Sequence, residues 1–202
     1  MQAFWDFIKQ GDYENRQKST GKRVFYRFHT PRQPGFPAML ELFSRVPDAL
    51  DSEKGATLTP LPVDEEASSL SAILMDGDYY ALVMERRAEL RGLSLVGADV
   101  LIPLKARAWV DLAGRRAAGE HIDSRNITKH RNDIFRLFTV LDREAAITLP
   151  DRICSDLRVA FARLSGEPAD LKSLGISGIQ LPELLAELSR LYGLDRALPG
   201  GR

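Results

Sequence analysis

The stretch from Leu101 to Leu141 constrains the fold of this chain more than any other part of the sequence. Its apolar residues recur at the three- and four-residue spacings that place side chains on one face of a helix. They form two sets on either side of a polar turn that contains glycine: Leu101, Leu104, Ala108 and Leu112, then Ile127, Ile134, Phe138 and Leu141. The stretch therefore predicts two amphipathic helices joined by a turn.

Cationic side chains lie on these two apolar faces. Lys105 is four residues from both Leu101 and Trp109. His130 and Arg131 lie within the second face. A cation on the inward face of a helix is costly to bury unless an anion meets it, and either a protein carboxylate or a ligand phosphate would serve. Lys105 has the further alternative of extending its amine into water along an apolar stem.

The composition excludes several classes of protein. The 202 residues include 28 basic and 28 acidic side chains, so the net charge is zero and gives no strong nucleic-acid signal. A single cysteine, Cys154, rules out an internal disulfide and is typical of a reducing compartment. No apolar run reaches the ~20 residues that a membrane span needs, and the first residues do not resemble a signal peptide. We therefore expect a cytoplasmic protein without a membrane partner.

The N-terminal residues predict a helix followed by antiparallel strands. Apolar spacing predicts the helix over residues 3–10, with Gly11 as its terminator. The sequence predicts strands over 13–18, 23–29 and 38–43, with a hairpin turn at 19–21 between the first two. Both faces of the third strand are apolar apart from Glu41, so we expect this strand to be central and covered on two sides. Three antiparallel strands after a helix indicate an α+β fold, with a small antiparallel-rich sheet backed by helices.

The middle of the chain contains many Pro and Gly breaks. The sequence predicts, in order, a loop-rich passage over 46–66 with a short strand at 57–61, two segments at 70–74 and 79–86 that fit either strand or helix, and an extended run at 93–96. Asp76, Gly77 and Asp78 predict a turn rather than a metal site. A helix is expected to start at residues 97–99, with Pro103 in or near its first turn, where a missing N–H matters least.

The remaining sequence predicts a helical region. Its two helices have these apolar residues: Ile153, Leu157, Ala160, Phe161 and Leu164 in the first, and Leu185, Leu188 and Tyr192 in the second, which Pro182 opens. A connector over 166–178 is expected to hold one short helical turn, and Cys154 is expected to be a small packing residue. The pattern divides the chain into a sheet-containing part, residues 1–97, and a helical region, residues 98–202.

Two carboxylates are candidates for chemistry. Glu41 lies alone on an apolar strand, so it must be paired, protonated or bound to a metal. A pair with a cross-strand arginine such as Arg27 is the favoured interpretation, and the alternatives are a metal- or substrate-facing role and partial exposure to solvent. Asp133 lies four residues after Lys129, a spacing that predicts a surface ion pair on one helix.

Three segments together resemble a known family: AFWDFIKQGDYENRQKSTGKRVFYRF, FPAMLELFSR and LIPLKARAWVDLAGRRAAGEHIDSRNITKHRNDIFRL. They are similar to bacterial nucleotidyltransferase-like proteins related to the AbiEii toxins of type IV toxin–antitoxin systems, which are components of phage defence. The resemblance covers residues 1–141 and is most specific between Lys105 and Leu137. It is a likeness of spacing and pattern.

This resemblance implies a partial nucleotidyltransferase-like fold and a set of site residues. The ancestral reaction would be Mg²⁺-dependent transfer of a nucleotide from an NTP to a hydroxyl or phosphate acceptor. By resemblance, Glu41 would be the third metal-binding carboxylate and Lys105 would contact the phosphates. Asp133 would belong to a later motif that orients basic groups, and His130 and Arg131 would join Lys105 in binding substrate.

The chain departs from the family at one important point. The Gly-Ser turn and Asp-x-Asp pair that supply the other two carboxylates do not occur before Tyr13. The resemblance therefore implies either the C-terminal part of a longer product or a shortened, inactive relative, with Mg²⁺ bound only if the missing carboxylates are supplied. The alternative function is a non-catalytic interaction module that binds a protein partner, either antitoxin-like or a second copy of this chain. Zero net charge favours this alternative.

Overall fold

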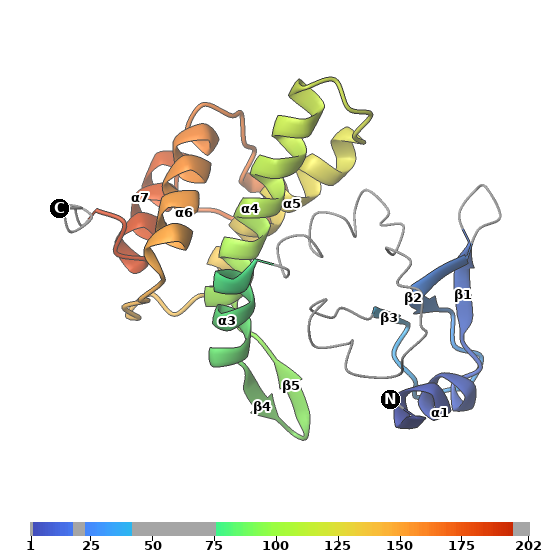
Figure 1. The fold of residues 1–202 in the computed structure, drawn as a ribbon. Helices are drawn as coiled ribbons and strands as arrows, with labels where there is room; N and C mark the ends of the chain where they lie inside the picture. The colour runs from blue at the N-terminus through green and yellow to red at the C-terminus, as the bar shows by residue number, and fades with distance from the viewer. Residues whose placement is uncertain (1, 18–22, 42–75, 196–202) are drawn as a thin grey trace. The chain divides into compact units, whose positions relative to one another are not determined.

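The computed structural model describes residues 2–17, 23–41 and 76–195. They belong to two compact units, Met1–Asp64 and Glu65–Arg202 (Figure 1). The first unit contains a three-stranded antiparallel sheet, and the second contains a two-stranded one together with most of the helices. The predicted α+β class is confirmed. The turn at 19–21, the strand at 57–61 and the segment at 70–74 lie outside the described residues.

None of the helices in the described ranges combines the length and the apolar character that crossing a lipid bilayer requires.

The first unit consists of α1 (Gln2–Gln10), β1 (Glu14–Gln17), β2 (Arg23–His29) and β3 (Met39–Glu41). Each strand pairs antiparallel with its sequence neighbour, in the order β1-β2-β3. The predicted helix and strands are confirmed within a few residues at their ends. The prediction that the third strand is central is wrong, because β2 lies between the other two and Met39 on β3 is 54% exposed. Antiparallel strands that pair in sequence order leave β3 as the outermost of the three described strands, whatever its apolar pattern.

The corner between α1 and β1 is packed so closely that it requires glycine. A Cβ on Gly11 would lie 2.5 Å from the ring of Tyr13 and 2.8 Å from the ring of Phe36. The rings of Phe7 and Phe36 pack with centroids 4.9 Å apart, and the Tyr13 hydroxyl donates to the Pro37 carbonyl at 2.6 Å. Gly11 thus follows the last residue of α1, as predicted, and lets the chain turn beneath the aromatic rings.

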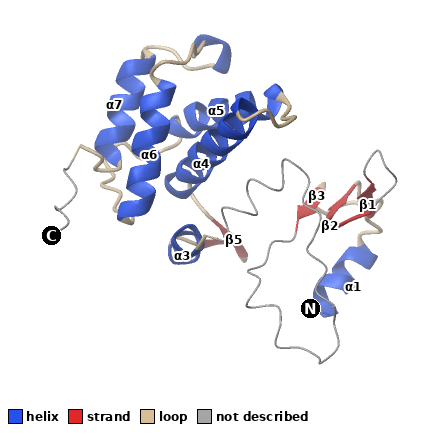
Figure 2. Cartoon of the chain, turned by 45° about the horizontal axis from the view of Figure 1, so that its top comes forward, coloured by secondary structure: helices blue, strands red, loops and turns tan. Residues whose placement is uncertain are grey.

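The second unit carries the larger helices (Figure 2). Its elements are α3 (Gly77–Glu85), β4 (Ala88–Leu90), β5 (Leu93–Leu95), α4 (Ala98–Ala117), α5 (Ser124–Phe138), α6 (Asp151–Leu164), the 3₁₀ turn η2 (Lys172–Leu174) and α7 (Leu181–Leu191). The two helices predicted within 101–141, the extended run before α4 and the short turn in the 166–178 connector are confirmed. α4 packs against both α5 and α6, and α3 contacts α4 and α6.

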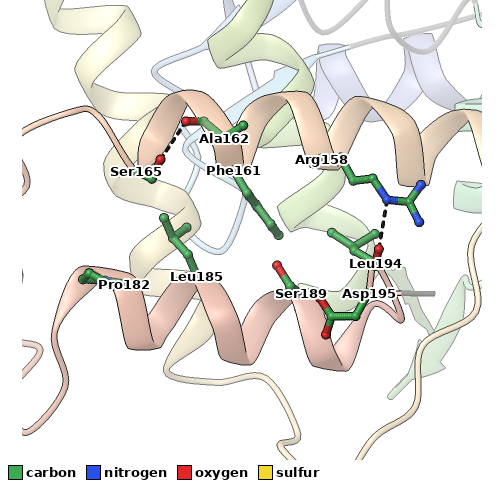
Figure 3. Close-up of a pocket in the computed structure, with 9 residues that line it drawn as sticks. All are labelled: Arg158, Phe161, Ala162, Ser165, Pro182, Leu185, Ser189, Leu194 and Asp195. Carbon is green, nitrogen blue, oxygen red and sulfur yellow. Dashed lines mark hydrogen bonds between the residues drawn. The ribbon is translucent and has the colours of Figure 1, made fainter. Parts of the chain in front are cut away.

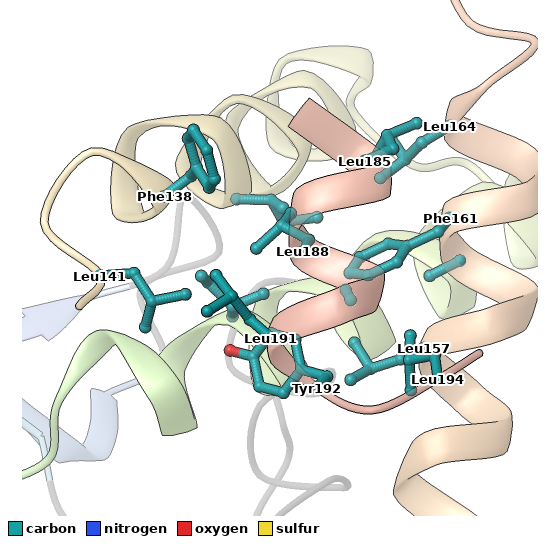
Figure 4. Close-up of a cluster of buried hydrophobic side chains, with 14 of the residues drawn as sticks. Phe138, Leu141, Leu157, Phe161, Leu164, Leu185, Leu188, Leu191, Tyr192 and Leu194 are labelled. Carbon is teal, nitrogen blue, oxygen red and sulfur yellow. The ribbon is translucent and has the colours of Figure 1, made fainter. Parts of the chain in front are cut away.

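A single apolar core joins these helices. Every apolar residue predicted for α6 and α7 is buried, and so is Cys154, whose thiol pKa is raised by desolvation. Figure 4 shows Leu188 of α7 among side chains from α5 and α6, including Phe138 and Phe161. Burying a large apolar side chain contributes about 1.5–3 kcal/mol, so this cluster is the main stabilising contribution in the unit.

α3 is bound to the other helices by polar contacts. Asp76 begins it: its carboxylate accepts from the Asp78 N–H at 3.1 Å and pairs with Arg152 of α6 at 3.0 Å. The prediction of a plain turn at residues 76–78 is therefore wrong, because an aspartate before Gly-Asp is also a good helix N-cap. The ambiguous segment at 79–86 is helical up to Glu85. Residues 76–97 thus lie with the helices, whereas the sequence pattern groups them with residues 1–75.

Pro103 lies within the hydrogen-bonded part of α4. It is the sixth residue of that helix, so its missing N–H leaves the Asp99 carbonyl without a helical partner. The Tyr192 hydroxyl, which follows α7, donates to this carbonyl at 3.1 Å. The prediction that Pro103 lies where a missing N–H matters least is therefore wrong. A tyrosine near the end of the chain replaces the missing donor.

The Tyr192 contact predicts a conditional effect of Pro103. We expect Tyr192→Phe to lower the free energy of unfolding by about 1–2 kcal/mol, because a buried carbonyl loses its donor. Pro103→Ala supplies a helical N–H to that carbonyl, so it should recover more stability in the Tyr192→Phe background than in the wild-type chain. Urea denaturation of the two single variants and the double variant measures this difference. Equal effects of Pro103→Ala in both backgrounds would contradict the assigned hydrogen bond.

Two buried phenols make the stability of this unit depend on alkaline pH. Burial and then the charge of Asp156 raise the pKa of Tyr79, and burial and then the charge of Asp99 raise the pKa of Tyr192. Above the unfolded value of about 10, the unfolded chain therefore releases protons that the folded chain keeps. The contribution to stability is complete below about pH 10 and is lost as the pH rises, at about 1.4 kcal/mol per unit for each tyrosine.

We therefore expect the free energy of unfolding to fall by roughly 2.7 kcal/mol per pH unit above about pH 10 from these two groups together. Tyr192→Phe should remove about half of that slope, since Tyr79 is then the remaining phenol of the pair whose pKa is raised in the folded state. Urea titrations between about pH 9 and 11 would measure both slopes. An unchanged slope in the variant would show that Tyr192 ionises as easily in the folded state as in the unfolded one.

Candidate functional site

The turn between α4 and α5 places side by side the two helices that carry all the predicted site residues except Glu41. Asp123 caps α5, because its carboxylate accepts from the Arg125 N–H at 2.9 Å. Hydrogen bonds from the Arg125 side chain, 2.6 Å from that carboxylate at the closest, lower the pKa of Asp123 to about 2. Ile122, next to the cap, is buried. The turn therefore ends one helix and starts the next within a few residues, and the two helices pack against each other.

Lys105 of α4 and Asp133 of α5 meet across this contact. The Nζ atom of Lys105 lies 3.0 Å from Oδ2 of Asp133, and the two side chains are 20% and 22% exposed. The second carboxylate oxygen lies 3.7 Å from Arg136. A protein carboxylate is therefore the partner of Lys105 in this structure. The predicted pair between Lys129 and Asp133 is wrong, because Asp133 lies against α4 while Lys129 stays exposed.

The other two predicted substrate-binding residues are placed differently. His130 is 4% exposed and lies on the buried face of α5. Arg131 is directed toward the segment after α6, where it donates to the Pro168 carbonyl at 3.0 Å and lies 3.9 Å from the Glu167 carboxylate. Of the three predicted cations, Lys105 is the one that contacts a carboxylate of the neighbouring helix α5.

Glu41 is at the end of β3. The strand register places it directly opposite Arg27 of β2, the arginine that the sequence suggests as a partner. The side chains of both residues lie outside the described ones. Glu41 belongs to the first unit and Lys105 to the second. A site shared by Glu41 and Lys105 therefore stays a prediction.

A second ionic cluster lies on another side of α4. Arg107 is 3.2 Å from Oδ1 of Asp156, and the Tyr79 hydroxyl donates to Oδ2 of the same carboxylate at 3.0 Å. Lys105 and Arg107 are two residues apart, so they point to different sides of the helix. The sequence analysis missed this cluster, because Asp156 shows no motif and its partners come from two helices distant in the chain.

An open groove of about 370 Å³ lies between α6 and α7 (Figure 3). Phe161, Leu185 and Leu194 supply much of its apolar wall, and Arg158 and Asp195 lie along it. The Nε atom of Arg158 donates to the Leu194 carbonyl at 2.9 Å, so this arginine joins α6 to the segment after α7. None of the predicted site residues lines the groove.

Comparison with known proteins identifies no relative of this chain. No protein-family model, curated protein or solved structure matches this chain.

The Lys105–Asp133 pair predicts energetic coupling between α4 and α5. Lys105→Met and Asp133→Asn each remove one charge while keeping most of the side-chain shape. Because both groups are partly exposed, we expect their coupling in a double-mutant cycle to be about 1 kcal/mol, measured by urea denaturation. Lys129→Met with Asp133→Asn is the matched control and should show coupling near zero. Coupling as strong for Lys129 as for Lys105 would mean that Asp133 pairs within α5 in solution.

Proposed function

We propose that this chain is a nucleotidyltransferase-like protein, related to AbiEii-type toxins, in which α4 and α5 contact the phosphates of a nucleotide. The proposal includes a partial nucleotidyltransferase-like fold for the sheet-containing part. Its main support is the 3.0 Å contact between Lys105 and Asp133. The resemblance assigns both residues to one site, they lie where that resemblance is most specific, and they are in contact although distant in sequence.

The chemistry of the pair is suited to phosphate. A lysine ammonium is a compact point charge that neutralises phosphate oxygens. One-fifth of the Lys105 side chain is exposed, and the Asp133 carboxylate keeps it in position. A phosphate would have to share the ammonium with that carboxylate, so we expect nucleotide affinity to be weak. Arg136, which is 56% exposed beside Asp133, adds a second cation to the same surface.

Magnesium enters this proposal as part of the Mg²⁺–NTP complex. Two-metal nucleotidyl transfer needs several carboxylates around the ions. Among the described residues, no three His, Cys, Asp or Glu side chains are grouped in a way that could hold a metal. The described residues thus do not fit a resident Mg²⁺, and the role proposed for Lys105 is binding rather than a metal-dependent step.

A non-catalytic interaction module is the second candidate. It is favoured by one observation, which is that protein groups already hold the cations of the helices. Asp133 contacts Lys105, Asp156 contacts Arg107, and the Pro168 carbonyl accepts from Arg131. In this case the cations stabilise helix packing, and a nucleotide would have no effect on them. The two candidates therefore differ in what Lys105 does when a nucleotide is present.

Titration with Mg²⁺–NTP distinguishes the candidates. We expect saturable binding with a Kd of roughly 0.1–1 mM at low ionic strength. Chemical-shift changes of the α4 and α5 amides would measure this binding. Lys105→Met should raise the Kd at least fivefold, because the phosphate contact is lost. Lys172→Met removes the same charge from an exposed lysine on η2 and should leave the Kd unchanged.

Each variant is first checked by urea denaturation, so that weaker binding is not confused with unfolding. Equal affinity of the wild-type chain and Lys105→Met for the nucleotide would contradict the proposed role of Lys105. Absence of binding by the wild-type chain at about 10 mM nucleotide would favour the interaction module.

A further inference from the structure

The hairpin formed by β4 and β5 presents apolar side chains to solvent. It extends from the end of α3 away from the helices of its unit (Figure 1). Leu90, Leu93 and Leu95 are 60%, 70% and 40% exposed, which is unusual for three leucines in six strand residues. This surface takes no part in the nucleotide proposal.

The exposed leucines lie on one face of the hairpin. Residues directly opposite each other in an antiparallel pair point to the same side. The pairs Ala88–Leu95 and Leu90–Leu93 therefore share one face, and Glu89 and Ser94 lie on the other. Such alternation is typical of a hairpin that is covered on its apolar side. Within the described residues that side is open.

The hairpin is also well formed in itself. Its two-residue turn has Arg91 at φ 53° and Gly92 at φ 77°, the left-handed pair of a type I′ turn, whose twist matches that of the strands. At its base, Arg86 donates to the Thr148 carbonyl at 3.0 Å and lies 3.7 Å from the Asp99 carboxylate. The chain therefore holds the hairpin at one end and leaves its strands exposed.

The two outer edges of the hairpin differ in charge. β4 carries Glu89 and is preceded by Arg87, whereas no charged residue occurs between Arg91 and Asp99 around β5. Proteins usually guard an unpaired strand edge with charges, proline or a bulge, because its open N–H and C=O groups recruit other strands. The edge of β5 has none of these features. It is the edge on which another strand would pair.

We propose that β5 pairs antiparallel with β5 of a second copy of this chain, around a two-fold axis at Ser94. The pair next to a two-residue turn, Leu90–Leu93, exchanges its hydrogen bonds within the hairpin, so the N–H and C=O of Ser94 point outward. Antiparallel pairing centred on Ser94 lets the two copies exchange both bonds. It also places Leu93 opposite Leu95 of the second copy, with no charges facing each other.

A second copy fits this edge because the register is self-complementary. The same three residues serve both partners, and the leucines of both hairpins join into one apolar face on a four-stranded sheet. The contact closes on itself, so it forms a dimer and not a fibre. An edge of three residues buries far less than the roughly 800 Å² per partner of a stable complex, so the dimer is weak and depends on concentration.

A cysteine placed on the axis tests this register directly. Opposed residues of an antiparallel pair have Cα atoms about 5.5 Å apart, within the range for a disulfide. In a chain whose own cysteine is removed by Cys154→Ala, the variant Ser94→Cys should form covalent dimers under mild oxidation. Glu89→Cys is the matched control, because residue 89 lies on the same face as Ser94 but on β4, away from the axis. This variant should remain mostly monomeric.

Light scattering across a concentration series completes the test. We expect the average mass of the wild-type chain to rise with concentration and Ser94→Lys, which places like charges at the axis, to stay monomeric. The unfolding midpoint of Ser94→Lys should not change, because Ser94 is exposed. Equal cross-linking of both cysteine variants would overturn the register. A wild-type monomer up to about 1 mM would overturn the dimer, and another segment of the chain or a different protein would then cover the leucines.

Discussion

The inward polar groups of α4 determine how the helical unit is arranged. This helix packs against α5 and α6, so a charge or carbonyl on those sides loses water and needs a protein partner. Three such groups each have a partner from another helix or, in one case, from the residue after a helix. Lys105 meets Asp133, Arg107 meets Asp156, and the carbonyl that Pro103 cannot satisfy accepts from Tyr192. Leaving the carbonyl without a donor would cost about 1–3 kcal/mol, and the two partly exposed ion pairs contribute less, so these contacts favour the observed packing of the helices.

This arrangement bears on both proposed functions. A lysine held by a carboxylate at a partly open surface can contact a phosphate without a large rearrangement, but the carboxylate competes for the same charge. Under the proposed function, the contact that aligns α4 with α5 would also limit nucleotide affinity. The hairpin presents the opposite case, because its leucines contribute nothing to the described core. Because the hairpin has a well-formed turn and an uncharged edge, we infer that a partner outside this chain covers its leucines.

The helical parts of the fold could be predicted because they depend on local spacing. Apolar positions such as Leu157 and Leu188 recur at helical intervals, and both are buried where the pattern placed them. Strands β1, β2, β3 and β5 were predicted from their local sequence patterns, whereas β4 was not predicted. The order of the strands in the first sheet was not predicted, because the apolar pattern around Met39 on β3 fits an outer strand as well as a central one. The start of α3 at Asp76 was missed because one short sequence suits both a turn and a helix cap.

The sequence by itself determined the larger helices, their apolar faces and the presence of cations within those faces. Only the tertiary structure decided which partner each polar group has. Asp133 is four residues from Lys129, an acceptable local pair, yet it lies against Lys105 because the packing of α4 on α5 removes most of the Lys105 side chain from water. Asp156 and Tyr192 likewise acquire their partners from helices far away in the chain. Local spacing does not encode such contacts, since they depend on how whole helices pack.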